Sequence, residues 1–138
     1  MGAILLKDIT LEGSRKDILI SNGLISKIEP SGSCADWELA GDIEIMDCSG
    51  KVAIPGFINM HTHSPMSMMR GLGEDMLFPE WLDTIWKAEE NLDAEYVYWA
   101  TKVACIEMIR TGTTTFNDQY WFFDASVKAA TEMGLRIA

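Results

Sequence analysis

The sequence predicts an α/β protein in which an N-terminal group of β-strands precedes a series of parallel βα units. In residues 1–54, short apolar runs alternate with polar turns, as in a set of strands. From residue 55 onward, strand-like runs alternate with longer segments whose apolar residues recur at helical spacing. Such alternation is typical of parallel sheets covered by helices. We therefore predict two domains, residues 1–54 and residues 55–138.

The N-terminal domain contains a strong hairpin signal. Asn22-Gly23 separates the apolar runs at residues 17–20 and 24–28, and both turn residues tolerate the positive φ angles of a type I′ turn. Residues 43–46 alternate apolar and polar side chains, as a further strand would. Residues 32–41 lack periodicity and are interpreted as a loop. We expect these strands to form one layer of a β-sandwich.

The second domain begins with an apolar run followed by an irregular stretch. Residues 57–60 are mostly apolar, as in a strand that is buried on both faces. The following residues, 64–79, are interrupted by proline and glycine, which favours a long loop of functional importance. Within the next stretch, only residues 80–87 are predicted to hold a helical turn.

Two helices and two further strands complete the second domain. Asp93 is a plausible N-cap for a helix that ends before Gly112. The β-branched residues 113–115, followed by Phe116, predict a second strand. Asp124 is predicted to cap the second helix, which ends at Gly134 and leads into a third strand. Three strands are too few to close a barrel, so we expect a βα fold that breaks off in its third strand.

Composition narrows the classes of partner. The formal net charge of −10 repels phosphate backbones and anionic lipids, which argues against nucleic-acid and membrane partners. No apolar run approaches the roughly 18 residues of a membrane helix, and the N-terminus lacks the pattern of a secretory signal. Cys34, Cys48 and Cys105 show no CxxC spacing, which favours a reduced, cytoplasmic location.

His61 and His63 are the candidate metal ligands. Side chains two residues apart on a strand point the same way, so both imidazoles face one side. They stand at the end of an apolar strand, where parallel α/β barrels place their active sites, and imidazole suits zinc or iron. Spacing alone leaves open two histidines of an ordinary strand, but the preceding Pro-Gly and the following loop favour a metal site. Asp118, at the end of the second strand, either faces this site or caps the following turn, and we favour the cap.

Several segments resemble a known family. Residues 55–63, PGFINMHTH, resemble the metal-binding first strand of the amidohydrolase superfamily, and residues 47–51 resemble the lead-in from its β-sandwich. The segments SPMSMMRG, EWL, EMIRTGTT and FND resemble one branch of that superfamily. This branch contains the 5′-methylthioadenosine/S-adenosylhomocysteine deaminases and related chlorohydrolases. The resemblance extends along the whole chain.

The resemblance implies a fold and a reaction. It implies β-sandwich strands followed by the first βα units of a (β/α)8 metal-dependent hydrolase barrel, truncated here in strand 3. One zinc or iron ion is expected to activate a water that attacks C6 of an adenine ring, releasing ammonia. His61 and His63 match the first two metal ligands. Trp81 matches a residue that lines the nucleoside pocket, and Glu89 matches a carboxylate that holds the ribose hydroxyls, with Glu90 as the alternative.

Other parts of the family's site have no counterpart among residues 1–138. The remaining metal ligands, a histidine and an aspartate, and the acid/base residues are expected beyond residue 138, so no catalytic residue is assigned. Because a catalytic zinc usually has three protein ligands, we expect this polypeptide alone to bind metal weakly and to be inactive. The first alternative is the same fold acting on guanine, cytosine or a chlorotriazine. The second is a catalytically inactive fragment that folds or self-associates through incomplete barrel edges.

Overall fold

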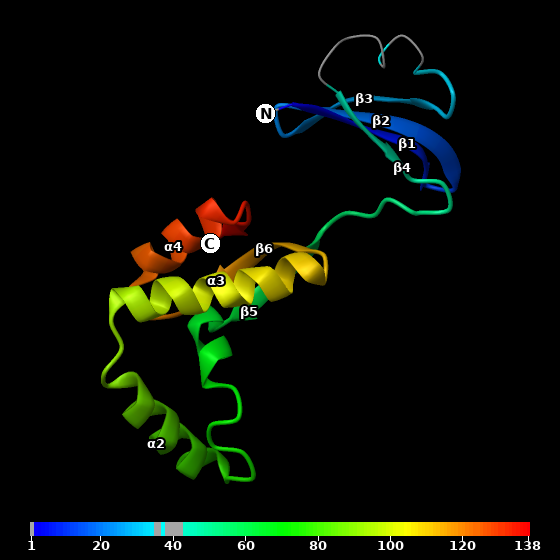
Figure 1. Ribbon diagram of the computed structural model, residues 1–138. Coiled ribbons are helices and arrows are strands. Elements are labelled where there is room, and N and C mark those ends of the chain that lie inside the picture. Colours follow the sequence, from blue (N-terminus) through cyan, green and yellow to red (C-terminus); the bar gives the residue numbers. More distant parts are fainter. Residues whose placement is uncertain (1, 35–36, 38–42) are drawn as a thin grey trace. The chain divides into compact units, whose positions relative to one another are not determined.

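The computed structural model describes residues 2–34, 37 and 43–138, and the loop expected at residues 32–41 falls mostly outside them. The chain divides into two compact units, Met1–Pro55 and Gly56–Ala138. Strands make up most of the described part of the first unit, and strands alternate with helices in the second (Figure 1). The α/β class predicted from the sequence is therefore confirmed. No described helix is both long enough and apolar enough to cross a membrane.

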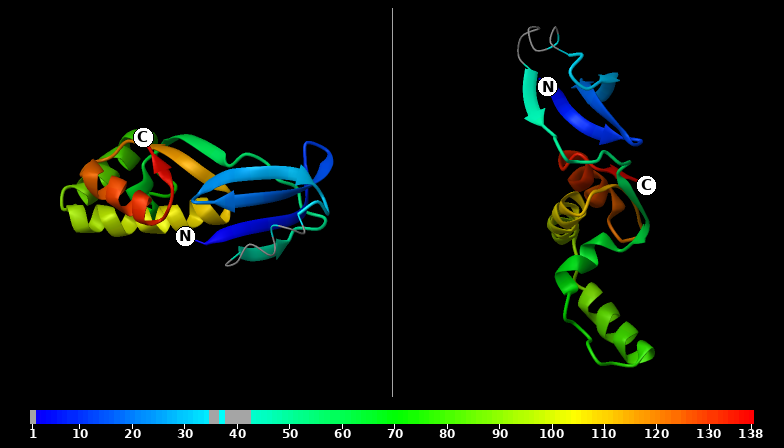
Figure 2. Two further views of the ribbon diagram at one scale, coloured as in Figure 1. Left: turned by 90° about the horizontal axis from the view of Figure 1, so that it is seen from above. Right: turned by 90° about the vertical axis from the view of Figure 1, so that its right-hand side faces the viewer.

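The first unit is a four-stranded sheet with the order β3-β2-β1-β4 (Figure 2). Its strands are β1 (Ala3–Leu11), β2 (Ser14–Ser21), β3 (Leu24–Pro30) and β4 (Ile43–Asp47). The pairs β1–β2 and β2–β3 are antiparallel, whereas β1 and β4 are parallel. The described strands thus form one layer, and its place in a β-sandwich stays a prediction.

Local residues explain how this sheet turns and bends. Asn22 and Gly23 have φ angles of 51° and 76°, the positive values that a type I′ hairpin requires. The register of β1 against β2 shifts between Leu6 and Ile9, where Asp8 has a φ of 61°. The buried Asp17 carboxylate accepts a hydrogen bond of 2.8 Å from the Asp8 backbone N–H. This bulge explains why two apolar runs in the sequence form one strand.

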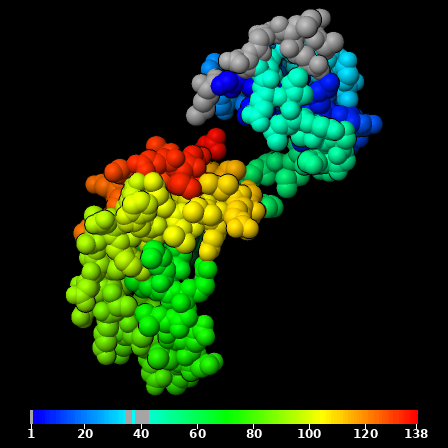
Figure 3. Space-filling model, viewed as in Figure 1, coloured from blue at the N-terminus to red at the C-terminus, as the bar shows by residue number. Residues whose placement is uncertain are grey.

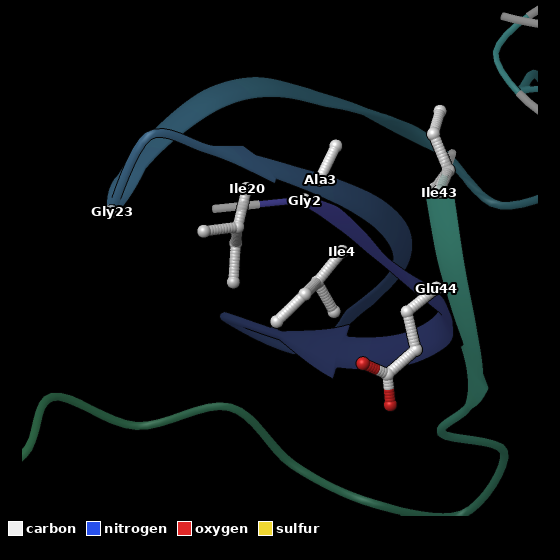
Figure 4. A pocket seen from close by; sticks show the side chains of 7 residues that line it. All are labelled: Gly2, Ala3, Ile4, Ile20, Gly23, Ile43 and Glu44. Carbon is white, nitrogen blue, oxygen red and sulfur yellow. The ribbon is translucent and has the colours of Figure 1, made fainter. Parts of the chain in front are cut away.

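One end of this sheet carries a shallow apolar hollow of about 570 Å³. Figure 4 shows Ile4, Ile20, Ile43 and Glu44 among the side chains that line it. A small buried cluster of Ile9, Ile18 and Cys48 packs against Ile20, which also lines the hollow, and Leu5 is buried as well. The small size of this cluster agrees with a sheet that forms only one layer.

The second unit is a parallel sheet with the order β5-β6-β7, connected by helices. Its strands are β5 (Phe57–Thr62), β6 (Thr113–Asp118) and β7 (Arg136–Ile137). Helix α3 (Ala94–Arg110) precedes β6, and α4 (Phe123–Glu132) precedes β7. The two helices lie side by side, as the yellow atoms of α3 and the orange-red atoms of α4 show in Figure 3. This is the start of a βα series.

The long connection between β5 and α3 is more regular than the sequence indicates. A 3-10 helix, η1 (Ser64–Met69), follows β5 directly, and α2 (Phe78–Glu89) comes next. Pro79 stands in the first turn of α2, where a missing N–H costs nothing, and Lys87 stands in the last turn. The expected helical turn is therefore a twelve-residue helix. Only Ile85 of α2 is buried, although Trp81, Leu82 and Ile85 recur at the spacing of an amphipathic helix.

The helix caps agree with the sequence at α3 and differ at α4. The Asp93 carboxylate accepts a hydrogen bond of 2.7 Å from the Tyr96 backbone N–H, so Asp93 is the N-cap as predicted. In α4 the N-cap is Phe122, in the left-handed conformation with a φ of 53°. The prediction of Asp124 as this cap was wrong. Asp124 lies within the first turn, where its charge still complements the helix dipole.

Burial in the second unit is concentrated between the helices and β6. Phe116, Cys105, Ala130 and Leu135 form its buried cluster. The expectation that residues 57–60 are buried on both faces was wrong, since Ile58 is 61% exposed and Met60 is 71% exposed. Within the described residues β5 has a hydrogen-bonded neighbour, β6, on one side only, so half of its surroundings are open.

Candidate metal and nucleoside site

The two histidines lie together at the carboxyl end of β5. His61 belongs to the strand, and His63 is the N-cap residue of η1. Their ring centroids are 4.9 Å apart, with the ring planes 88° to each other. Both residues are exposed. Two imidazoles at this separation can direct nitrogen lone pairs toward one point in the solvent.

A backbone carbonyl fixes the tautomer of His63. Its Nδ1 lies 2.6 Å from the carbonyl oxygen of Gln119. Because a carbonyl oxygen only accepts, Nδ1 must carry a hydrogen, and in the neutral ring Nε2 is then left with a free lone pair. Metal-binding histidines are commonly oriented in this manner, by donating their other ring N–H to a carbonyl or carboxylate. The Gln119 backbone N–H also donates to the Thr62 carbonyl over 3.0 Å, which fixes the carbonyl's own position.

A buried polar chain anchors the residue after His63. The Asp118 carboxylate accepts hydrogen bonds from the Ser64 backbone N–H over 2.8 Å and from the Ser64 hydroxyl over 2.7 Å. The Ser64 hydroxyl lies 3.3 Å from Thr101 Oγ1, which lies 3.1 Å from Ser126 Oγ. All four side chains are buried. Asp118 thus stabilises the start of η1, the helix that follows β5. The prediction that Asp118 caps the turn after β6 was wrong.

Most of the predicted site residues line one cavity of about 670 Å³. His63, Trp81 and Glu89 all contribute to its wall, whereas His61 does not. Residues not predicted from the sequence also line it, among them Ile85, Tyr120 and Trp121. The wall is rich in aromatic and aliphatic side chains with few polar groups, the usual composition of a small-molecule site.

The polar side of this cavity is formed by Glu89, the last residue of α2. Its Oε1 accepts a hydrogen bond of 2.7 Å from the Tyr120 hydroxyl, and both residues are half-buried. Burial, reinforced by the hydrogen bond to the carboxylate, raises the pKa of Tyr120, so the hydroxyl stays protonated and donates. Glu90, the alternative left open by the sequence, is exposed and does not line the cavity.

Trp81 is held by residues on either side of it. Its ring stacks on Phe78 with centroids 5.8 Å apart and planes 23° to each other. At Gly73, with a φ of +77°, an added Cβ would come within 2.8 Å of the indole Cδ1 of Trp81. The loop backbone therefore passes close to the indole, which explains a glycine at this position. Trp81 offers a flat apolar surface inside the cavity.

The donor set fits part of a zinc or iron site. His61 and His63 supply two nitrogen donors of the type that these ions prefer. Within residues 2–34, 37 and 43–138, no group of three or more His, Cys, Asp or Glu side chains is arranged to hold a metal. Since catalytic zinc usually has three protein ligands, this chain offers an incomplete set.

The chain is similar to several known enzymes. A 5′-deoxyadenosine deaminase of Methanocaldococcus jannaschii is 48% identical over 134 residues, covering 96% of this chain and 31% of the relative. The crystal structure of an adenosine deaminase from Xanthomonas campestris with bound zinc has a TM-score of 0.79 and 27% identity, covering 98% of this chain and 32% of that one. An atrazine chlorohydrolase from Arthrobacter aurescens TC1, complexed with zinc, has a TM-score of 0.77 at 23% identity, covering 97% and 34%, which shows the fold alone.

The chain spans about a third of the length of these relatives. The model of the amidohydrolase family matches residues 52–138, the region that contains both histidines, the cavity and the parallel sheet. The parallel strands, the histidine pair at the end of β5 and this match all lead to one assignment. The chain belongs to the amidohydrolase family.

Proposed function

We propose that this chain supplies part of the active site of a metal-dependent deaminase that acts on an adenosine-type nucleoside. The observation that carries the proposal is the cavity that brings His63, Trp81 and Glu89 together. Its relatives include 5′-deoxyadenosine deaminases of methanogens, which supports an adenine nucleoside as the substrate class. The proposal concerns the full-length protein, because the chain alone spans only part of those relatives.

In this proposal, His61 and His63 hold a divalent metal, zinc in preference to iron. The Gln119 carbonyl keeps the hydrogen of His63 on Nδ1, which leaves Nε2 available as the donor. The Lewis-acid activation of water for attack on the amino-bearing carbon of the base is the chemistry that such a metal supplies. A metal binds a histidine only in its neutral form. In that form the hydrogen bond to Gln119 keeps Nε2 unprotonated before any metal binds.

The remaining cavity residues bind and orient the nucleoside. The indole of Trp81 provides an apolar surface for the purine ring, and Phe78 keeps that indole in place. The Glu89 carboxylate only accepts hydrogen bonds, so it matches the two hydroxyl donors of a ribose. With the base toward His63 and the sugar toward Glu89, the substrate lies along the cavity.

The competing substrates lack a ribose. Guanine, cytosine and chlorotriazines carry no sugar hydroxyls, so Glu89 would remain buried against them without a partner from the ligand. A half-buried carboxylate in the cavity wall therefore favours a nucleoside over a free base or a triazine. The likeness to the triazine-hydrolysing structures concerns the fold alone.

The test is a substrate screen on the full-length protein that contains this chain. Adenosine, 5′-deoxyadenosine, adenine, guanine, cytosine and a chlorotriazine are compared by the release of ammonia or chloride. We expect deamination of the adenine nucleosides, loss of activity in His61→Ala, and a selective rise in KM for nucleosides in Glu89→Ala. Glu90→Ala is the matched control, since Glu90 is exposed and lies outside the cavity wall.

Two outcomes would contradict the proposal. Release of chloride from the triazine without deamination of any nucleoside would assign the chlorohydrolase reaction instead. No turnover of any of these compounds by folded full-length protein would favour the alternative of a chain that only folds or associates.

A further inference from the structure

The cavity contains a second polar group whose role the proposed function does not use. Tyr120 lies just beyond β6 and donates its hydroxyl hydrogen to Glu89, at the end of α2, over 2.7 Å. The two residues are 31 positions apart in the sequence, and both line the cavity. We propose that Tyr120 is a positioning residue that holds Glu89 ready for a ribose and so selects ribonucleosides over deoxyribonucleosides. This inference rests on the proposed function.

The direction of the hydrogen bond defines what Glu89 can still accept. A carboxylate has no hydrogen to give, so the phenol is the donor, and it occupies one acceptor site of Oε1. Within the described residues the Glu89 carboxylate has no ion-pair partner and no second hydrogen bond. Oε2 and the second lone pair of Oε1 are therefore available to two hydroxyl groups of a ligand.

The segment that contains Tyr120 also holds the metal side of the cavity. Gln119, its neighbour, accepts from His63 Nδ1 over 2.6 Å, and Asp118 accepts from Ser64 over 2.8 Å. The rings of His63 and Tyr120 have centroids 6.4 Å apart. Residues 118–120 thus contact the end of β5 and the end of α2 at once. Through Tyr120, this segment fixes the spacing between His63 and Glu89.

Removing the hydroxyl should loosen only the ribose end of the site. Tyr120→Phe keeps the ring and its packing, while Glu89 loses its one side-chain partner. Because hydrogen bonds to charged groups are stronger than neutral ones, we expect KM for adenosine to rise about tenfold. We expect kcat to change less than about twofold, because the lost interaction serves binding and not the chemical step. The KM for 2′-deoxyadenosine should change far less, because that ligand has one hydroxyl fewer to orient.

Tyr98→Phe is the matched control. Tyr98 donates to Glu132 Oε2 over 2.6 Å, the same type of bond across 34 positions, but in an exposed place away from the cavity. It should leave both KM values unchanged. Glu89→Asp, which withdraws the carboxylate from Tyr120 by one methylene, provides a second variant and should also lower the preference for adenosine over 2′-deoxyadenosine.

The experiment measures kcat and KM for adenosine and 2′-deoxyadenosine in the full-length protein and its variants, with folding checked by circular dichroism. An equal rise in both KM values, or a fall in kcat alone, would overturn the inference while the proposed function stands. If the unmodified protein deaminates neither nucleoside, the proposed function and the inference fall together. If Tyr120→Phe does not fold, an unchanged preference in Glu89→Asp would overturn the inference.

Discussion

The Asp118 carboxylate receives two hydrogen bonds from a single residue, Ser64, through its backbone N–H at 2.8 Å and its hydroxyl at 2.7 Å. Asp118 ends β6, and Ser64 begins η1 directly after His63. This buried pair connects the end of β6 with the start of η1, at the edge where parallel sheets place their ligands. The position of the second histidine therefore depends, through Ser64, on a carboxylate 54 positions beyond that serine.

Asp118→Asn is expected to destabilise the protein. The amide offers one acceptor oxygen in place of two, so one Ser64 donor is left buried without a partner. A buried unsatisfied group costs on the order of 1–3 kcal/mol. Urea unfolding followed by tryptophan fluorescence measures the loss. Asp83→Asn, on the exposed side of α2, is the control and should change the stability little; an equal effect of the two variants would refute the role of the pair.

His63 is expected to carry its hydrogen on Nδ1 before metal is added, because the Gln119 carbonyl accepts at that atom. Nitrogen-15 NMR of the imidazole rings measures the tautomer directly, and with only two histidines in these 138 residues the assignment is simple. Addition of zinc should then shift the Nε2 resonance of His63 and leave Nδ1 protonated. A resting tautomer with the hydrogen on Nε2 would contradict the proposed donor.

We expect the stability of the protein to depend on pH in the alkaline range, because of Cys105. Burial raises the pKa of its thiol from 9.0 to about 11, and the negative charge of the nearby Asp118 is the second, smaller cause of this rise. Its folded-state pKa exceeds its unfolded value, so its contribution to stability is fully present below pH 9 and is lost as pH rises toward 11. Urea unfolding between pH 8 and pH 11 should show a steeper decline in the parent protein than in Cys105→Ala. Parallel declines would refute this prediction.

The isolated 138-residue chain is expected to self-associate through β5. Ile58 and Met60 are 61% and 71% exposed, and the strand has a paired neighbour on one side only within the described residues. An open, apolar strand edge favours pairing with another copy. Light scattering after size exclusion should show a concentration-dependent mass that Met60→Lys lowers. Leu77→Lys, at a similar exposure of 72% but outside any strand, is the control; a monomer at every concentration would contradict this view.

Local chemistry explains which parts of the fold could be predicted from the sequence. The Asn22-Gly23 turn and the Asp93 cap depend on residues a few positions apart, so the sequence alone indicates them. Helix α2 was predicted only as a turn, although Trp81, Leu82 and Ile85 recur at helical spacing, because the prolines and glycines before it favoured a loop. Phe122 initiates α4 from a left-handed conformation that no common cap residue signals.

The candidate site likewise has a part that the sequence predicts and a part that it does not. The alternation of strand side chains places His61 and His63 together, and the rings are adjacent in the structure. The contacts of Tyr120 with Glu89 and of Asp118 with Ser64 join residues 31 and 54 positions apart. Such contacts depend on how β5 and β6 are aligned, which includes register shifts that no local pattern reveals.

The metal content of the full-length protein tests the central claim most directly. Protein purified without chelators is analysed by elemental mass spectrometry, beside His61→Ala, His63→Ala and the double variant. We expect about one divalent ion per chain in the parent protein, as in catalytic zinc sites, and its loss from all three variants. Retention of that ion by a folded double variant would contradict the account, because the metal would then be held elsewhere than at the end of β5.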